Sequence, residues 1–141
     1  MSTSATELLL DTHVWIWLAF DDPKLTGSAR RDISEAASSS SVVVPAVAVW
    51  EIAMLSSRRR LELDLPVGEW VGKALSGGQV RLAELTTEIM IEAYDLPAPF
   101  HGDPADRLIV ATARLRGATL LTRDRRILAY GALGHVRVNP A

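Results

Sequence analysis

The strongest constraint on the fold is the alternation of short apolar runs with longer segments of helical pattern. The run SVVVP at 41–45 is short, rich in β-branched residues and free of polar alternation, which is typical of a buried strand. Strands that alternate with helices predict an α/β fold, with a mainly parallel sheet covered on both faces. We expect strands at 7–10, 41–45, 79–85, 118–121 and 135–138, and helices at about 12–20, 27–37, 47–57, 66–75, 86–96, 104–116 and 123–131.

Length and composition limit the class of protein. The 141 residues suffice for one domain but hardly for two, so we expect a single domain over residues 1–141, with residues 1–6 flexible. The chain has no cysteine, which excludes disulfides, thiolate zinc sites and cysteine nucleophiles. No apolar run approaches the ~20 residues that span a bilayer, and the start of the chain does not resemble a signal peptide. We therefore expect a cytoplasmic protein with no membrane partner.

Several acids stand in unusually apolar surroundings. Asp11 interrupts the run LLLDTHVWIWLAF at 8–20, and Glu51 is the one charged residue between positions 42 and 55. Asp106 shares a helix face with apolar residues, and Asp124 follows the apolar strand in TLLTRD. Because burying a lone carboxylate costs several kcal/mol, acids in such places need a partner or a function.

These four acids are expected at one edge of the sheet. Asp11 and Asp124 both follow strands, and the carboxyl ends of parallel strands are where ligand sites form. Glu51 and Asp106 come from helices near that edge. Carboxylates gathered in one cleft repel each other unless a cation lies between them, and all-oxygen ligation suits Mg²⁺ or Mn²⁺. Such an ion can orient phosphate and generate hydroxide for phosphodiester hydrolysis.

Helix capping offers another explanation for some of these acids. Asp11 and Asp124 each stand where they can cap the helix that follows. Asp106 could be the acid of a capping arrangement in which Asp103 caps the helix that begins at Pro104. We expect Asp103 to be that cap and a supporting residue of the site, whereas Asp is short for the reciprocal contact at Asp106. Capping leaves Glu51 unexplained, and it does not account for four acids at one edge. Other chemistries fit poorly, because no phosphate-binding P-loop, dinucleotide fingerprint or G-x-S-x-G elbow is present.

Four segments carry a resemblance to a known family. They are LLLDTHVWIWL from position 8, AVAVWEIAML from position 46, HGDPADRLIVATA from position 101 and TLLTRD from position 119. Their order and spacing resemble the PIN-domain ribonucleases, most closely the VapC toxins of type II toxin–antitoxin modules. The resemblance implies a three-layer α/β/α fold and Mg²⁺- or Mn²⁺-dependent endonucleolytic cleavage of RNA. It also implies a homodimer that a VapB-like antitoxin inhibits, in a heterotetramer or a larger complex.

The resemblance also implies roles for individual residues. Asp11 and Asp106 would hold the metal most directly, and Glu51 would complete the site or position the attacking water. Asp124 would bind a second ion or tune the first, with Thr122 as a supporting hydroxyl. The chain departs from the family before the middle helix, where it has PAVAVWE and relatives often carry Ser or Thr. That departure affects the helix cap and leaves the acid in place.

Two further expectations concern partners. The net charge is −2, so local clusters must supply positive charge for RNA. We expect Arg123, Arg125 and Arg126 to neutralise RNA phosphates, although such runs also occur as solvated helix ends. We also expect the helix at 12–20 and the helix around Trp50 to expose aromatic surface, covered in part by antitoxin and in part by a second copy.

Two alternative functions fit the same residues. One is a PIN-type nuclease that acts in RNA processing or on DNA, outside any toxin module. The other is a catalytically inactive binding module whose acids are purely structural. Binding of Mn²⁺ at the acidic cleft separates the nuclease from the binding module.

Overall fold

A five-stranded parallel sheet forms the centre of the computed structural model, which describes residues 6–100 and 102–141. The strand order is β3-β2-β1-β4-β5, and every neighbouring pair is parallel. The chain therefore runs outward from β1 through β2 to β3, and then crosses back to place β4 on the other side of β1. The carboxyl ends of β1 and β4 flank this reversal, which is where open α/β sheets bind ligands. The strands are β1 (Leu8–Leu10), β2 (Val42–Pro45), β3 (Val80–Ala83), β4 (Thr119–Thr122) and β5 (Arg137–Pro140).

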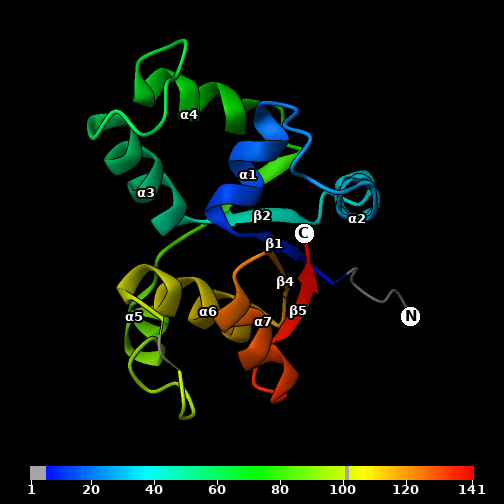
Figure 1. The fold of residues 1–141 in the computed structure, drawn as a ribbon, viewed down its shortest axis with the longest axis vertical. Helices are drawn as coiled ribbons and strands as arrows, with labels where there is room; N and C mark the ends of the chain where they lie inside the picture. The colour runs from blue at the N-terminus through cyan, green and yellow to red at the C-terminus, as the bar shows by residue number, and fades with distance from the viewer. Residues whose placement is uncertain (1–5, 101) are drawn as a thin grey trace.

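Helices cover both faces of the sheet, as Figure 1 shows with α1, α3 and α4 above the strands and α6 and α7 below them. Leu8 and Leu10 pack in one buried cluster with residues of α1 to α4, whereas Leu9 packs in a second cluster with residues of α6 and α7. This alternation follows from the strand period of two. The helices are α1 (Thr12–Ala19), α2 (Gly27–Ser38), α3 (Ala46–Ser57), α4 (Val67–Ser76), α5 (Thr87–Glu92), α6 (Pro104–Arg116) and α7 (Arg125–Ala132).

The predicted three-layer α/β/α architecture is confirmed, and two elements are shorter than expected by three residues or more. The strand predicted at 79–85 forms a ladder only over Val80–Ala83, because β2 offers it four partners, from Val42 to Pro45. The helix predicted at 86–96 ends at Glu92. Beyond this point the chain forms tighter turns, in which the Tyr94 and Asp95 amides donate to carbonyls three residues earlier. Pro97 follows and cannot continue a helix.

Helix ends follow the expected capping chemistry. Asp103 caps α6, and Gly117 ends that helix with a φ of 62°. Helix α3 begins after Pro45 and has no side-chain cap hydrogen bond, which is the consequence expected from the missing Ser or Thr. The expectation that residues 1–6 are flexible falls almost wholly on residues 1–5, which lie outside the described residues. No helix in the described part of the chain is long and apolar enough to cross a membrane.

The aromatic surface was expected on two helices, the helix at 12–20 and the helix around Trp50, and the structure agrees with this expectation in part. Trp50 on α3 is 62% exposed, as predicted. Trp15 on α1 is 2% exposed and packs against Trp70, with 5.6 Å between the ring centroids. The expectation for the helix at 12–20 therefore holds at Phe20, which is 43% exposed, and fails at Trp15, because this side of α1 faces the sheet and α4.

Candidate active site

The acids predicted from the sequence line one pocket of about 530 Å³ at the carboxyl edge of the sheet. They come from four segments, namely the end of β1, helix α3, the first turn of α6 and the start of α7. The predicted arginines border the same pocket, and three residues that were not predicted, His13, Val14 and Trp17, also line it. The lining residues are Asp11, His13, Val14, Trp17, Glu51, Asp103, Asp106, Arg123, Asp124, Arg125 and Arg126.

Two neighbouring strand ends hold the carboxylate of Asp11. Its Oδ1 accepts a hydrogen bond from the Thr12 amide at 2.7 Å, which caps α1. Its Oδ2 accepts one from Thr122 Oγ1 at 2.6 Å, and Thr122 is the fully buried last residue of β4. The Asp124 amide donates to the same Thr122 oxygen at 3.0 Å. Thr122 therefore joins the two strand ends, which fits its predicted supporting role.

Glu51 faces the pocket from the middle of α3. Its Oε1 accepts a hydrogen bond from Thr12 Oγ1 at 2.5 Å, and this contact joins α3 to the start of α1. Thr12 is 1% exposed, so its hydroxyl is a buried donor that fixes the Glu51 carboxylate. The sequence interpretation missed Thr12. The available signal was its place directly after Asp11, at the end of a buried strand.

Capping accounts for some of the acids but not for all of them. Asp103 Oδ1 accepts from the Asp106 amide at 2.9 Å, which confirms the predicted cap of α6. Asp124 Oδ1 accepts from the amides of Arg126 and Ile127 at 2.8 and 3.2 Å, so Asp124 caps α7. Asp106 stands in the first turn of α6, where a hydrogen bond from the Asp103 backbone lowers its pKa, as in a reciprocal capping arrangement. Glu51 lies in the middle of α3, where capping gives no reason for an acid.

The carboxylates of the pocket are desolvated and repel one another. Burial raises the pKa of Asp11, and the charge of Asp124 adds to that rise. Burial also raises the pKa of Glu51, with further contributions from Asp11 and Asp103. The pKa of Asp106 rises to about 7, first through burial and then through the nearby charges of Asp103, Asp124 and Asp11. Ionised together, these carboxylates repel one another across the pocket.

The donor set has the chemistry of a site for a hard divalent cation. Its ligating atoms are carboxylate oxygens, and a cation would relieve both the repulsion and the desolvation. The side chains as they lie are not converged on one point, since no three His, Asp or Glu residues of the described chain form a group that could hold a metal ion. The residues thus fit a cation by the type and charge of their side chains, and not by the arrangement in which those side chains now lie.

Arg123 makes contacts that the sequence interpretation did not foresee. Its Nε donates to the carbonyl of Ala141 at 2.9 Å, and an Nη donates to the carbonyl of Lys24. Its guanidinium carbon lies 4.6 Å from the centre of the Trp17 ring. The Trp17 ring in turn lies 6.2 Å from the ring of His13, at a tilt of 52°. A contact with RNA phosphate stays a prediction for all three arginines.

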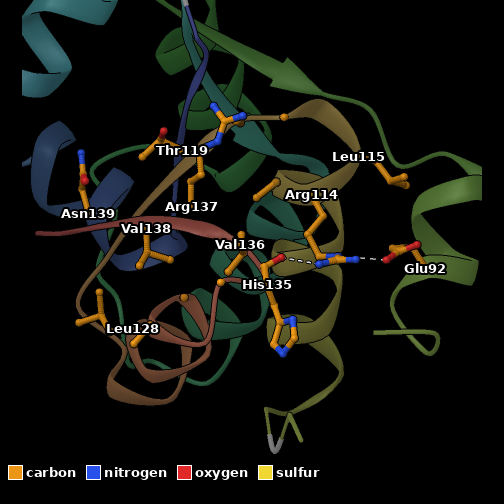
Figure 2. Close-up of a pocket in the computed structure, with 16 residues that line it drawn as sticks. Glu92, Arg114, Leu115, Thr119, Leu128, His135, Val136, Arg137, Val138 and Asn139 are labelled. Atoms are coloured by element: carbon orange, nitrogen blue, oxygen red, sulfur yellow. Dashed lines mark hydrogen bonds and ion pairs between the residues drawn. The ribbon is translucent and has the colours of Figure 1, made fainter. Parts of the chain in front are cut away.

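A larger hollow of about 880 Å³ lies elsewhere, against α6, α7 and β5 (Figure 2). Glu92 is the one acid among its described lining residues, and it forms an ion pair with Arg114 at 3.1 Å. Arg114 also donates to the carbonyl of His135, as the dashed lines in Figure 2 show. Glu92 and Arg114 link α5 to α6 here, so the clustered acids of the other pocket are the better candidate for chemistry.

Comparison with known proteins supports the same assignment. Residues 8–133 match the PIN domain family. The chain is 36% identical over 125 residues to Ribonuclease VapC22 of Mycobacterium tuberculosis (strain ATCC 25618 / H37Rv), over 89% of this chain and 92% of that protein.

Solved structures of low sequence identity share the fold. VapBC2 from Rickettsia felis, bound to a DNA fragment from their promoter, has a TM-score of 0.69 at 11% identity, over 96% of this chain and 98% of that one. DNA-bound VapBC from Salmonella typhimurium has a TM-score of 0.67 at 15% identity, also over 96% and 98%. With the family match and the likeness to VapC22, these results show that the chain belongs to the PIN-domain family, among the VapC ribonucleases.

Proposed function

We propose that this protein is an endoribonuclease toxin of a type II toxin–antitoxin pair, and that it hydrolyses RNA with Mg²⁺ or Mn²⁺ in the acidic pocket. One observation carries the proposal. Four acids from separate segments of a VapC-like chain line a single pocket where the strand order of the sheet reverses. One of these acids, Glu51, lies in the middle of α3 and has no capping role that would explain it.

We propose for the acids the roles that the resemblance to the VapC toxins implies. Asp11 and Asp106 would hold the ion most directly, Glu51 would complete the site or orient the attacking water, and Asp124 would tune it or hold a second ion. When bound, the ion supplies charge neutralisation for phosphate and a more acidic water. Thr12 and Thr122 orient two of the carboxylates by donating to Glu51 and Asp11. Asp103 supports the site by capping the helix that carries Asp106.

Basic residues beside the acids would position the RNA strand. Arg125 and Arg126 border the pocket at the start of α7, where their charges can meet phosphates of a strand that enters it. Such contacts add affinity without reading bases. RNA binding should therefore depend first on the divalent ion, which reduces the acidic charge, and second on these arginines.

The proposed partners follow from the relatives. Structures with this fold include VapBC complexes bound to DNA, and a toxin–antitoxin complex from Klebsiella pneumoniae with a TM-score of 0.59 at 17% identity, over 86% of this chain and 90% of that one. By analogy, this chain would act as one domain over residues 1–141, form a homodimer and bind a VapB-like antitoxin. Its substrate would be cellular RNA, which places the active protein in the cytoplasm.

A cleavage assay tests the proposal. Purified protein is incubated with 5′-labelled RNA in Mg²⁺, with and without EDTA, and compared with Glu51→Gln. The control is Glu92→Gln, which alters an acid of the other hollow. We expect EDTA to stop cleavage, Glu51→Gln to lower the rate about 100-fold or more, and the control to cleave like wild type. Cleavage that survives EDTA or Glu51→Gln would contradict the site, and no cleavage of any RNA would favour the binding module.

A further inference from the structure

Three planar side chains stand against one another on one wall of the acidic pocket. His13 and Trp17 lie one helical turn apart on α1, with their ring centroids 6.2 Å apart. The guanidinium of Arg123 lies over the Trp17 ring, 4.6 Å from its centre. All three side chains line the pocket. We call this group the stacking platform.

The platform is held in place by the fold. Arg123 donates from Nε to the carbonyl of Ala141 at 2.9 Å, and from an Nη to the carbonyl of Lys24. These carbonyls belong to distant parts of the chain, so they fix the guanidinium over Trp17 from two sides. His13 and Arg123 are nevertheless exposed, and Trp17 is only half-buried. Planar groups held by the fold therefore line the pocket and stay at least partly exposed.

The other tryptophans show that Trp17 has a distinct position. Trp15 and Trp70 are 2% and 7% exposed and belong to the core. Trp50 is exposed but does not line the acidic pocket. Trp17 alone among the four combines partial exposure with a place beside the acids. Trp17 packs against the buried cluster on this face of the sheet, and core packing alone does not account for its place beside the acids.

We propose that the stacking platform holds one nucleobase of the RNA beside the scissile phosphate. The inference rests on the proposed ribonuclease function and adds a substrate-positioning device to it. Bases of single-stranded RNA stack on aromatic rings and on arginine planes. Every base has a stacking face, so the platform positions a nucleotide with little regard to its identity. Base stacking also lets the enzyme bind RNA without relying on charge, next to a cluster of negatively charged carboxylates.

The contacts of Arg123 favour stacking over phosphate binding. Tight phosphate recognition by arginine uses two parallel N–H groups of the guanidinium fork. In Arg123 the Nε and one Nη already donate to carbonyls. The guanidinium of Arg123 is therefore better placed to offer a fixed planar face, in contact with Trp17, than to offer two parallel N–H groups to a phosphate. This distinction can be tested, because lysine keeps the charge of arginine but loses the plane.

The test uses RNA from which single bases are missing. The wild-type cleavage site in a mixed-sequence RNA is first located by sequencing 5′ ends. A short RNA across that site is then made intact and with one abasic ribose at each flanking position. The kcat/KM of each RNA is measured for wild type, Trp17→Leu, Trp17→Phe and Arg123→Lys. Tyr94→Leu is the matched control, since Tyr94 is an exposed ring 5.2 Å from an arginine and lies outside the pocket.

We expect one abasic position to lower wild-type kcat/KM about 5- to 150-fold, the range that corresponds to one base stacked on an aromatic ring. Trp17→Leu should lower kcat/KM for intact RNA by the same factor and lose its sensitivity to that abasic position. Trp17→Phe should recover part of this sensitivity, Arg123→Lys should lose much of it, and Tyr94→Leu should behave as wild type. Thermal unfolding checks that each variant folds, and Arg123→Lys keeps the test open if Trp17→Leu does not.

Two results would overturn the inference. In the first, Trp17→Leu and Arg123→Lys keep the full wild-type sensitivity at every abasic position, which would make the stack a structural feature. In the second, wild type cleaves RNA but no single abasic position matters. A wild-type protein that cleaves no RNA at all would instead overturn the proposed ribonuclease function, and the platform with it.

Discussion

Asp11 combines a structural role and a candidate catalytic role in one geometry. One carboxylate oxygen caps α1 through the Thr12 amide, and the other accepts from Thr122 at the end of the neighbouring strand. These donors stabilise the charged form and lower the pKa, whereas burial raises it by more. The site thus keeps the Asp11 carboxylate oriented where burial makes its charge unfavourable. A cation bound beside such a carboxylate stabilises the protein most.

Asp106 provides a prediction at the scale of the residue. Its pKa rises from 3.8 to about 7 on folding, so the folded protein binds this proton more tightly than the unfolded chain does. The stability that protonation supplies is present at low pH and is lost as pH rises from about 4 to about 7. In metal-free protein, Asp106→Asn should therefore match wild type near pH 4 and exceed it above pH 7. Allowing for solvent screening of this half-buried group, the gain is on the order of 1–2 kcal/mol.

Chemical denaturation between pH 4 and pH 8 measures this difference. Asp95→Asn is the control, because Asp95 is exposed and lies outside the pocket. Added Mg²⁺ should stabilise wild type more than Asp106→Asn, since an ion that binds only the folded state raises its stability. A stability difference that does not change with pH would show that Asp106 is an ordinary surface acid.

For the helices and strands, the sequence predicted the type of each element better than its length. The run SVVVP identified β2 because a strand buried on both faces needs no polar alternation. The end of α5 was missed because the helical pattern of its sequence continues past Glu92, whereas the backbone tightens into turns before Pro97. Local pattern specified the type of each element, and the partners of each element decided its length.

The cap of α6 yields a prediction at the scale of the element. Asp103→Ala removes the acceptor for the Asp106 amide and should destabilise the protein by about 1 kcal/mol. Asp103→Asn keeps a good cap while it removes a charge that raises the pKa of Asp106. It should therefore keep or raise stability and lower the pKa of Asp106. Thermal unfolding and carboxyl NMR titration measure the two effects, and equal losses of stability in both variants would exclude a capping role.

At the scale of the whole molecule, the acids were predictable and the platform was not. Asp11 and Asp124 follow strands, and parallel strands bring their carboxyl ends to one edge, so sequence order alone places them together. Arg123 reaches Lys24 and Trp17 across about 100 residues of chain, and no periodicity reports such a contact. Long-range contacts of single side chains depend on the packed structure.

Exposed aromatic surface leads to a prediction about assembly. Trp50 on α3 is 62% exposed and Phe20 at the end of α1 is 43% exposed. Large apolar side chains in such positions favour an interface with a second copy or an antitoxin segment. We expect a dimer in analytical ultracentrifugation at micromolar concentration, and weaker association in Trp50→Ala. A wild-type protein that sediments as a monomer would count against the dimer.

Calorimetric titration with Mn²⁺ at pH 8 tests the central claim most directly, because the carboxylates of the pocket should then be ionised and able to bind a cation. Wild type, Asp11→Asn and the control Asp95→Asn are titrated without RNA, so the result does not depend on the substrate. We predict that wild type and Asp95→Asn bind Mn²⁺ equally, and that Asp11→Asn binds it about tenfold or more weakly. Equal affinity in all three proteins, or no binding by wild type, would contradict a divalent-cation site in the acidic pocket.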